Sequence, residues 1–265
     1  MKQIVHIASI AMLLASCQLS NDVDLRLPDQ KSFYVVEAVL KPGKPMELSF
    51  IESIRMNDAA SLNFVWNADA RFIQGNDTIP LMNFLFLRKE DSVVVNYTSK
   101  RLLPYQTNGS LTLFLKKGND TLTATAHFIK PVTAKSCKVN GLDIDATIEN
   151  SFASNDRFFR MEAFLYQPNK KKRPRYSQIY NLNNCIASEL LLHLKVGNVA
   201  RDSLKVVISH ISKEHYEYLY SSNRAFDAYF DPFAVPTQIK SNIKGGLGIF
   251  TVVSEDTLSF KSQYP

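Results

Sequence analysis

The chain contains the residue types that most often carry out catalysis, but their spacing does not form a catalytic pattern. His210 and His215 lie five positions apart across the expected start of a helix, so one helical face cannot hold both. The sequence has neither an H-E-x-x-H motif nor a G-x-S-x-G nucleophile motif. A hydrolase would therefore need carboxylates that only the fold brings together. We predict a non-enzymatic protein without a metal or organic cofactor.

A glycine-rich stretch near the end of the chain could be mistaken for a phosphate-binding loop. Gly245-Gly246-Leu247-Gly248 lacks both the G-x-G-x-x-G spacing and the lysine of a Walker motif. No helix is expected to follow it, so its backbone amides would not converge on a phosphate. Glycines also occur where two backbones approach closely at the start of a strand, and we favour this structural interpretation.

Two groups of side chains could bind a ligand or a surface. The basic segment 169–175 could contact an anion or lipid headgroups, although a solvent-exposed loop tip would have the same composition. The aromatic residues of segment 216–233 could line a ligand cleft, or they could pack a helix onto a sheet. The candidates are Lys170, Lys171, Lys172, Arg173 and Arg175 for anion or headgroup contact, and Tyr216, Tyr220, Tyr229 and Phe230 for the cleft.

The first seventeen residues have the organisation of a bacterial lipoprotein signal. Lys2 supplies the positive end, residues 4–14 supply an apolar run, and Leu14-Ala15-Ser16-Cys17 places two small residues before a cysteine. The apolar run is too short to span a bilayer as a mature helix. We expect cleavage of the signal peptide 1–16 and attachment of lipid to Cys17, so that acyl chains anchor the mature protein to a membrane.

The remaining two cysteines, Cys137 and Cys185, have two alternative roles. In an exported protein such a pair could form a disulfide, which would stabilise the fold by about 4 kcal/mol in the chain-entropy model. The alternative is a pair of buried, unreactive thiols, because spacing in the sequence does not show that the two Cα atoms come within bridging distance.

Residues 17–31 contain few apolar side chains and are expected to form a flexible tether. The acidic residues close behind Cys17 resemble the surface-export signal of Bacteroidota lipoproteins, which implies an outer-membrane protein that faces the cell surface. The net charge of +6 is concentrated in one segment and does not follow a helix face, so we do not expect nucleic acid binding.

The elements from residue 32 onward are predominantly strands, which predicts an all-β fold. Residues 64–72 alternate between apolar and polar side chains, and Gly-Asn-Asp-Thr tetrapeptides at 75–78 and 118–121 are typical of hairpin turns. About seven short strands predict an immunoglobulin-like β-sandwich over residues 32–131. A second β-rich domain, a sandwich or barrel-like unit, is expected over residues 135–265.

One helix is expected within the second domain, near residues 213–229. Ser212 is a favourable N-cap, and Glu214 lies in the first turn, where the helix dipole favours a negative charge. Tyr216, Leu219 and Tyr220 recur at helical spacing, and Asp231-Pro232 would end the helix.

Three segments together resemble the domain-of-unknown-function 4249 (DUF4249) lipoproteins of Bacteroidota. They are 156–160 (DRFFR), 209–220 with its EHYEY core, and the ending from Ser241-Asn242-Ile243 to Gly246-Leu247-Gly248-Ile249-Phe250. The resemblance covers nearly the whole mature chain, although this member looks short. Members are commonly encoded beside TonB-dependent outer-membrane transporters, which implies that such a transporter is the partner. The family offers no established catalytic or binding residues to transfer.

Five Asp-Ser/Thr-aliphatic triplets resemble the O-glycosylation sequon of exported Bacteroidota proteins. Junctions between a turn and a strand produce the same triplet by chance. The candidate acceptor residues are Thr78, Ser92, Thr121, Ser203 and Thr257.

Two functional hypotheses follow from the sequence and the resemblance. The first is a surface lipoprotein that captures or presents a ligand together with a TonB-dependent transporter. The second is a structural or adhesive surface module that binds protein or glycan. A concave, aromatic-lined pocket within residues 135–265 would favour the first, whereas an exposed strand edge or apolar patch without a cavity would favour the second.

Overall fold

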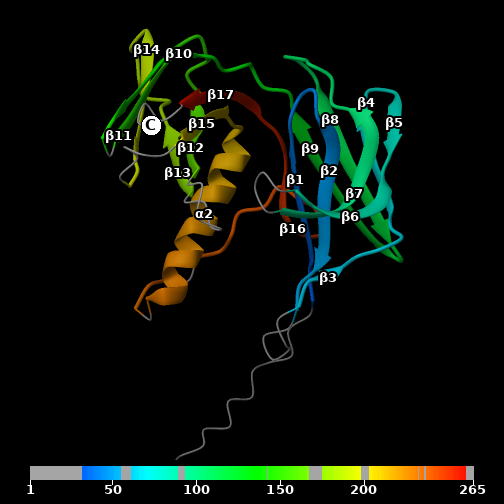
Figure 1. Ribbon diagram of the computed structural model, residues 1–265. Coiled ribbons are helices and arrows are strands. Elements are labelled where there is room, and N and C mark those ends of the chain that lie inside the picture. Colours follow the sequence, from blue (N-terminus) through cyan, green and yellow to red (C-terminus); the bar gives the residue numbers. More distant parts are fainter. Residues whose placement is uncertain are drawn as a thin grey trace, which may run out of the picture. The chain divides into compact units, whose positions relative to one another are not determined.

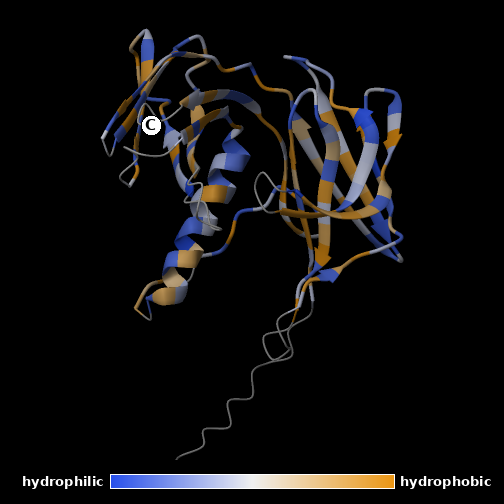
Figure 2. Ribbon diagram, viewed as in Figure 1, coloured by the Kyte–Doolittle hydropathy of each residue, from blue (hydrophilic) through white to orange (hydrophobic). Residues whose placement is uncertain are grey.

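The computed structural model describes residues 32–54, 61–88, 93–141, 143–166, 175–197, 203–231, 233–235 and 237–260. Within these ranges the chain forms seventeen strands and the helix α2, and the strands are arranged in four sheets (Figure 1). The predicted all-β class is confirmed. Along many strands hydrophobic and hydrophilic residues alternate, as Figure 2 shows, so each sheet has one face suited to a core.

The first two sheets enclose one hydrophobic core. One sheet has the order β16-β1-β2-β7-β6 with β3 paired to β2, and the other has the order β5-β4-β8-β9. The first comprises β1 (Tyr34–Leu40), β2 (Pro45–Glu52), β3 (Asn63–Phe64), β6 (Met82–Arg88), β7 (Val93–Leu102) and β16 (Leu247–Val252). The second comprises β4 (Asp69–Gln74), β5 (Asp77–Pro80), β8 (Ser110–Lys117) and β9 (Asp120–His127).

The two predicted hairpin turns join neighbouring strands of the second of these sheets. Gly75 lies between β4 and β5, and Gly118 lies between β8 and β9, both with φ of 59°. An L-residue with a side chain rarely adopts this left-handed conformation, which is why glycine occupies both turns.

Strand β16, which follows α2 in the chain, joins the N-terminal sandwich, although the sequence predicted a division of the chain at residues 131–135. It pairs with β1 in parallel, and the ring of Phe250 stacks on Phe72 with centroids 5.5 Å apart. The side chain of Asn242 makes two hydrogen bonds to the backbone of Phe250. Its Oδ1 accepts from the N–H of Phe250 at 2.9 Å, and its Nδ2 donates to the carbonyl of Phe250 at 2.7 Å. Phe250 and Val252 belong to the sandwich core, and α2 packs against β16, so this largely apolar strand is covered on both faces.

The other two sheets enclose a second core. Their orders are β10-β11-β14 and β13-β12-β15-β17. Ile144, Met161, Leu192 and Ile208 are fully buried between them. The strands are β10 (Ala134–Asn140), β11 (Asp143–Glu149), β12 (Phe158–Tyr166), β13 (Arg175–Asn181), β14 (Glu189–Lys195), β15 (Ser203–His210) and β17 (Ser254–Phe260).

The helix α2 (Lys213–Phe230) begins where it was predicted to begin. The N–H of His215 donates to Oγ of Ser212 at 3.2 Å, which satisfies one of the free amides of the first turn. The ring of Tyr216 lies 5.2 Å from that of Phe158 on β12, so the first half of the helix packs on a sheet. Asp231 ends the helix in an extended conformation.

Candidate functional site

A cavity of about 690 Å³ opens where three connecting segments meet the junction of β16 and β17. Its volume is in the range of sites for small molecules. The lining residues are Lys41, Pro42 and Lys44 of the β1–β2 turn, Tyr105, Gln106, Thr107 and Asn108 of the segment before β8, Ile129, Pro131 and Val132 of the segment before β10, and Val253, Ser254, Glu255 and Thr257.

Several polar contacts hold the walls of this cavity together. Nζ of Lys41 lies 3.0 Å from Oε1 of Glu255, so these two charges offset each other across the site. The N–H of Val132 donates to Oγ of Ser254 at 3.2 Å. The N–H of Val253 donates to the carbonyl of Leu40 at 2.9 Å. The cavity therefore depends on segments more than 200 positions apart in the sequence.

The lining combines neutral hydrogen-bonding groups with apolar surface. The amides of Gln106 and Asn108 and the hydroxyls of Thr107 and Thr257 can each both donate and accept. The exposed ring of Tyr105 and nearby proline and valine side chains provide apolar faces. Such groups suit a polar ligand rich in hydrogen-bonding atoms, and Lys44, which also lines the cavity, adds a positive charge.

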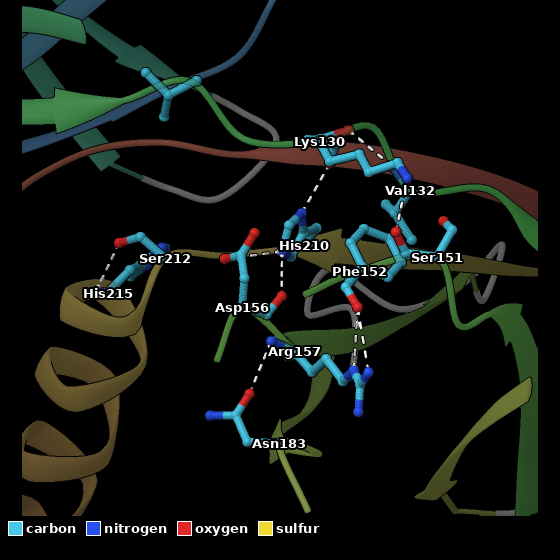
Figure 3. A network of polar contacts seen from close by, with 12 residues as sticks. Lys130, Val132, Ser151, Phe152, Asp156, Arg157, Asn183, His210, Ser212 and His215 are labelled. Atoms are coloured by element: carbon cyan, nitrogen blue, oxygen red, sulfur yellow. Dashed lines mark hydrogen bonds and ion pairs between the residues drawn. The ribbon is translucent and has the colours of Figure 1, made fainter. Parts of the chain in front are cut away.

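The segment that carries Ile129, Pro131 and Val132 is fastened by a buried histidine (Figure 3). Nδ1 of His210 lies 2.8 Å from the carbonyl oxygen of Lys130, and Nε2 lies 2.9 Å from that of Asp156. A carbonyl oxygen can only accept a hydrogen bond, so a ring nitrogen that bonds to it must donate, and Oδ1 of the Asp156 carboxylate lies 3.4 Å from Nε2. His210 thus ties β15 to one wall of the cavity.

Aromatic rings and further polar contacts complete this network. The ring centroid of Phe152 lies 4.6 Å from that of His210. Nζ of Lys130 donates to the carbonyl of Ser151 at 2.7 Å, and Nε and Nη2 of Arg157 donate to that of Phe152 at 3.3 Å (Figure 3). The N–H of Arg157 donates to Oδ1 of Asn183 at 2.9 Å. The contacts of this network join side chains to the backbone of neighbouring segments, so we interpret it as a structural brace.

A charged cluster lies where α2 meets β12 and β13. Oε1 of the buried Glu162 accepts from Nε of Arg175 at 2.8 Å and lies 3.0 Å from Nη2 of Arg160. His215 is also buried, and its Nδ1 has no hydrogen-bond partner among the residues that the structure describes. Burial, and secondarily the charge of Arg160, lowers the pKa of His215 to about 3.

The low pKa of His215 predicts a loss of stability in acid. Unfolding exposes this imidazole and returns its pKa to about 6.5. The unfolded state therefore binds a proton as pH falls below about 6.5, whereas the folded state does not bind it until pH falls to about 3. Between about pH 7 and pH 5 this histidine alone should lower the free energy of unfolding by about 2 kcal/mol. Urea titrations at both pH values should show a loss smaller by that amount in His215→Gln. An unchanged loss in His215→Gln would contradict the prediction.

The four aromatic residues predicted to line a ligand cleft lie at two different places along α2. Tyr216 and Tyr220 stack with ring centroids 6.1 Å apart, whereas the rings of Tyr229 and Phe230 contact each other at the far end of α2. None of these four side chains lines the cavity. Of the basic segment, Lys170, Lys171, Lys172 and Arg173 lie outside the described residues, and Arg175 is paired with Glu162.

The remaining candidates lie at several separate places. Cys137 and Cys185 are free thiols that pack against the second core. Burial, followed by the charge of Asp145, raises the pKa of Cys137 to about 11, so this thiol is a weak nucleophile. Cys17 lies outside the described residues. Of the glycosylation candidates, Thr78, Thr121 and Thr257 are exposed, Ser203 is half-buried and Ser92 lies outside the described residues.

The sequence analysis missed the cavity and the role of His210. The lining residues come from three connecting segments and the start of β17, and their residue types are common in any protein, so no local pattern marked them. From the sequence, the turn Lys41-Pro42-Gly43-Lys44-Pro45 and the segment at Pro131 could be recognised only as breaks between regular elements. The described ranges hold no group of three or more His, Cys, Asp or Glu residues that could bind a metal, and no helix in them is long and apolar enough to cross a membrane.

A comparison with protein families gives a match over most of the chain. A family model described as a domain of unknown function (DUF4249) matches residues 20–259, which is most of the chain. A search of the curated proteins finds no match. The resemblance seen in the sequence is therefore confirmed over both sandwiches.

Proposed function

The chain belongs to the DUF4249 family, and for this member we propose a non-enzymatic outer-membrane surface lipoprotein that captures a small ligand and presents it to a TonB-dependent transporter. The observation that carries the proposal is the cavity of about 690 Å³. It is large enough for a small molecule, and the charges of two of its lining residues, Lys41 and Glu255, pair with each other.

The lining favours a hydroxyl-rich ligand such as a short saccharide. Amide and hydroxyl side chains match the alternating donors and acceptors of sugar hydroxyls, and the ring of Tyr105 offers a face to the apolar side of a sugar ring. The lipid on Cys17 would keep the site at the membrane where a transporter operates. Capture without chemistry fits the absence of a catalytic motif in the sequence.

Purification of the tagged protein from gently solubilised outer membranes tests both parts of the proposal. We expect a transporter to copurify in stoichiometric amount, and a small hydrophilic molecule to be released on denaturation and detected by mass spectrometry. Thr107→Trp should fill the cavity and abolish this release, whereas Thr78→Trp, at an exposed hairpin threonine outside the cavity, should not. Absence of both transporter and bound molecule from intact surface protein would refute the proposal.

An alternative function as a structural or adhesive module has its own supporting observation. Strand β6 is the last strand in its sheet order and exposes Met82, Phe84, Leu85 and Leu87. Apolar strands at a sheet edge can pair with a strand of another protein. If this function holds, Phe84→Glu with Leu87→Glu will remove the copurifying proteins while Thr107→Trp leaves them in place.

A further inference from the structure

The far end of α2 carries a concentrated group of exposed aromatic side chains. Phe226, Tyr229, Phe230 and Phe233 are 66%, 83%, 68% and 93% exposed, and Val235 is exposed beside them. We call these five residues the helix-tip patch. The ring of Phe230 lies 5.0 Å from that of Phe226 and 5.1 Å from that of Tyr229, so these three rings form one contiguous surface.

This patch continues the apolar stripe by which α2 packs on its sheet. Tyr216 and Leu219 lie on the buried stripe, and Phe226 and Phe230 follow it at helical spacing. An 18-residue helix is about 27 Å long, and its second half extends past the ends of β12 and β13 (Figure 1). Figure 2 shows hydrophobic residues on this overhanging end. Nothing in the described part of the chain covers them.

The segment after the helix is held in place, so the patch is presented by an ordered structure. Oδ1 of Asp231 accepts from the N–H of Phe233 at 3.0 Å, and the N–H of Ala234 donates to the carbonyl of Asp231. Further along, the N–H of Lys240 donates to Oγ of Ser221 at 2.8 Å. The return segment is thereby fastened to the helix, and Phe233 and Val235 remain at its tip.

We propose that the helix-tip patch inserts into the headgroup region of the bilayer to which the protein is anchored. Phenylalanine and tyrosine are favoured at membrane interfaces, and a shallow insertion leaves Asp227 and Asp231 in the hydrated layer. The patch runs from the helix into the following turn, and a lipid surface adapts to such a convex tip without needing a complementary hollow.

The tether supplies the second argument for a membrane as the occupant. Residues 17–31 can extend at most about 50 Å, so a lipid on Cys17 would hold the folded part within that distance of the bilayer. Membrane contact would then be intramolecular, and a weak interfacial contact suffices at such an effective concentration. This inference rests on the lipid anchor of the proposed function, but it does not depend on the cavity.

Vesicle flotation of the mature chain from residue 17 with Cys17→Ser, which has neither the apolar signal peptide nor a site for acylation, tests the patch separately from the anchor. The probe is vesicles of phosphatidylethanolamine and phosphatidylglycerol. We expect this protein to float with vesicles, and the added changes Phe226→Ser, Phe230→Ser and Phe233→Ser to lower its partition coefficient by at least about tenfold. The matched variant with Phe84→Ser, Leu85→Ser and Leu87→Ser on β6 should float as before. Circular dichroism and urea unfolding verify that both variants fold.

Two outcomes would overturn the inference. One is no flotation of the Cys17→Ser protein, and the other is equal flotation with and without the helix-tip changes. If flotation is unaffected but the acylated helix-tip variant loses a copurifying protein, the patch is a protein contact and the membrane assignment fails. Release of the cavity-bound molecule from the helix-tip variant shows independently whether the proposed ligand capture is intact.

Discussion

Replacing Gly248 with alanine should disrupt the pairing of β16 with β1 and destabilise the protein by at least about 3 kcal/mol. Gly248 has φ of 114°, a conformation that side-chain-bearing residues rarely adopt. A Cβ atom there would collide with the carbonyl oxygen of Val36, its partner in the parallel ladder. Because the obstacle is backbone, no side-chain rotation can relieve the collision. Urea unfolding followed by circular dichroism measures the effect.

The matched control for this prediction is Gly75→Ala. Gly75 also has a positive φ, of 59°, but no atom lies within 4 Å of the position that its Cβ would take. Only the conformational cost of the left-handed backbone remains, about 1 kcal/mol. The difference between the two variants therefore isolates the close approach of β16 to β1. Equal unfolding midpoints would show that this approach is not needed for stability.

Replacing His210 with phenylalanine should cost about 3 kcal/mol of unfolding free energy, because an aromatic ring is kept while the contacts of its nitrogens with two backbone carbonyls are lost. The side chain is fully buried, so water cannot easily replace the donors for the carbonyl oxygens of Lys130 and Asp156. Loss of this brace should also loosen the segment 129–132 and release the cavity-bound molecule. Urea unfolding and mass spectrometry of the purified variant check the two effects.

His193→Phe provides the matched control for the buried brace. His193 is exposed on β14, where Nδ1 lies 2.8 Å from Oδ1 of Asp145. An exposed pair of this kind contributes at most about 1 kcal/mol, so the variant should unfold close to the wild type. If His210→Phe is as stable as His193→Phe, the two carbonyl contacts do not brace the fold.

The local structure of this protein was largely predictable because it depends on near neighbours in the sequence. The turns at Gly75 and Gly118 require a residue that tolerates positive φ, and Ser212 caps the helix through a hydroxyl three residues from its donor. The structural interpretation of the Gly245–Gly248 stretch is confirmed, since Cβ atoms at Gly245 and Gly246 would crowd the carbonyl oxygens of Thr121 and Tyr34. Each of these features can be deduced from a few adjacent positions.

The candidate site could not be predicted in the same way. Its walls come from segments near residues 41, 105, 130 and 255, and their side chains are common in any loop. The ring nitrogens of His210 contact the carbonyl oxygens of Lys130 and Asp156, which lie 80 and 54 positions away in the sequence. The four residues of the predicted aromatic cleft do not line this cavity, because Tyr216 follows the buried stripe of α2 while Tyr229 and Phe230 lie exposed at the other end of the helix.

The sequence by itself determined the β class, the turns, the start of the helix and the family, and it predicts the lipid anchor at Cys17. Only the tertiary structure decided that β16 completes the first sandwich, that a cavity forms beside the β16–β17 junction, and that one end of α2 remains uncovered. The physical reason is the distance along the sequence over which each interaction acts. Turn and cap preferences act over a few residues, whereas strand partners and cavity walls are selected by packing between segments far apart in the chain.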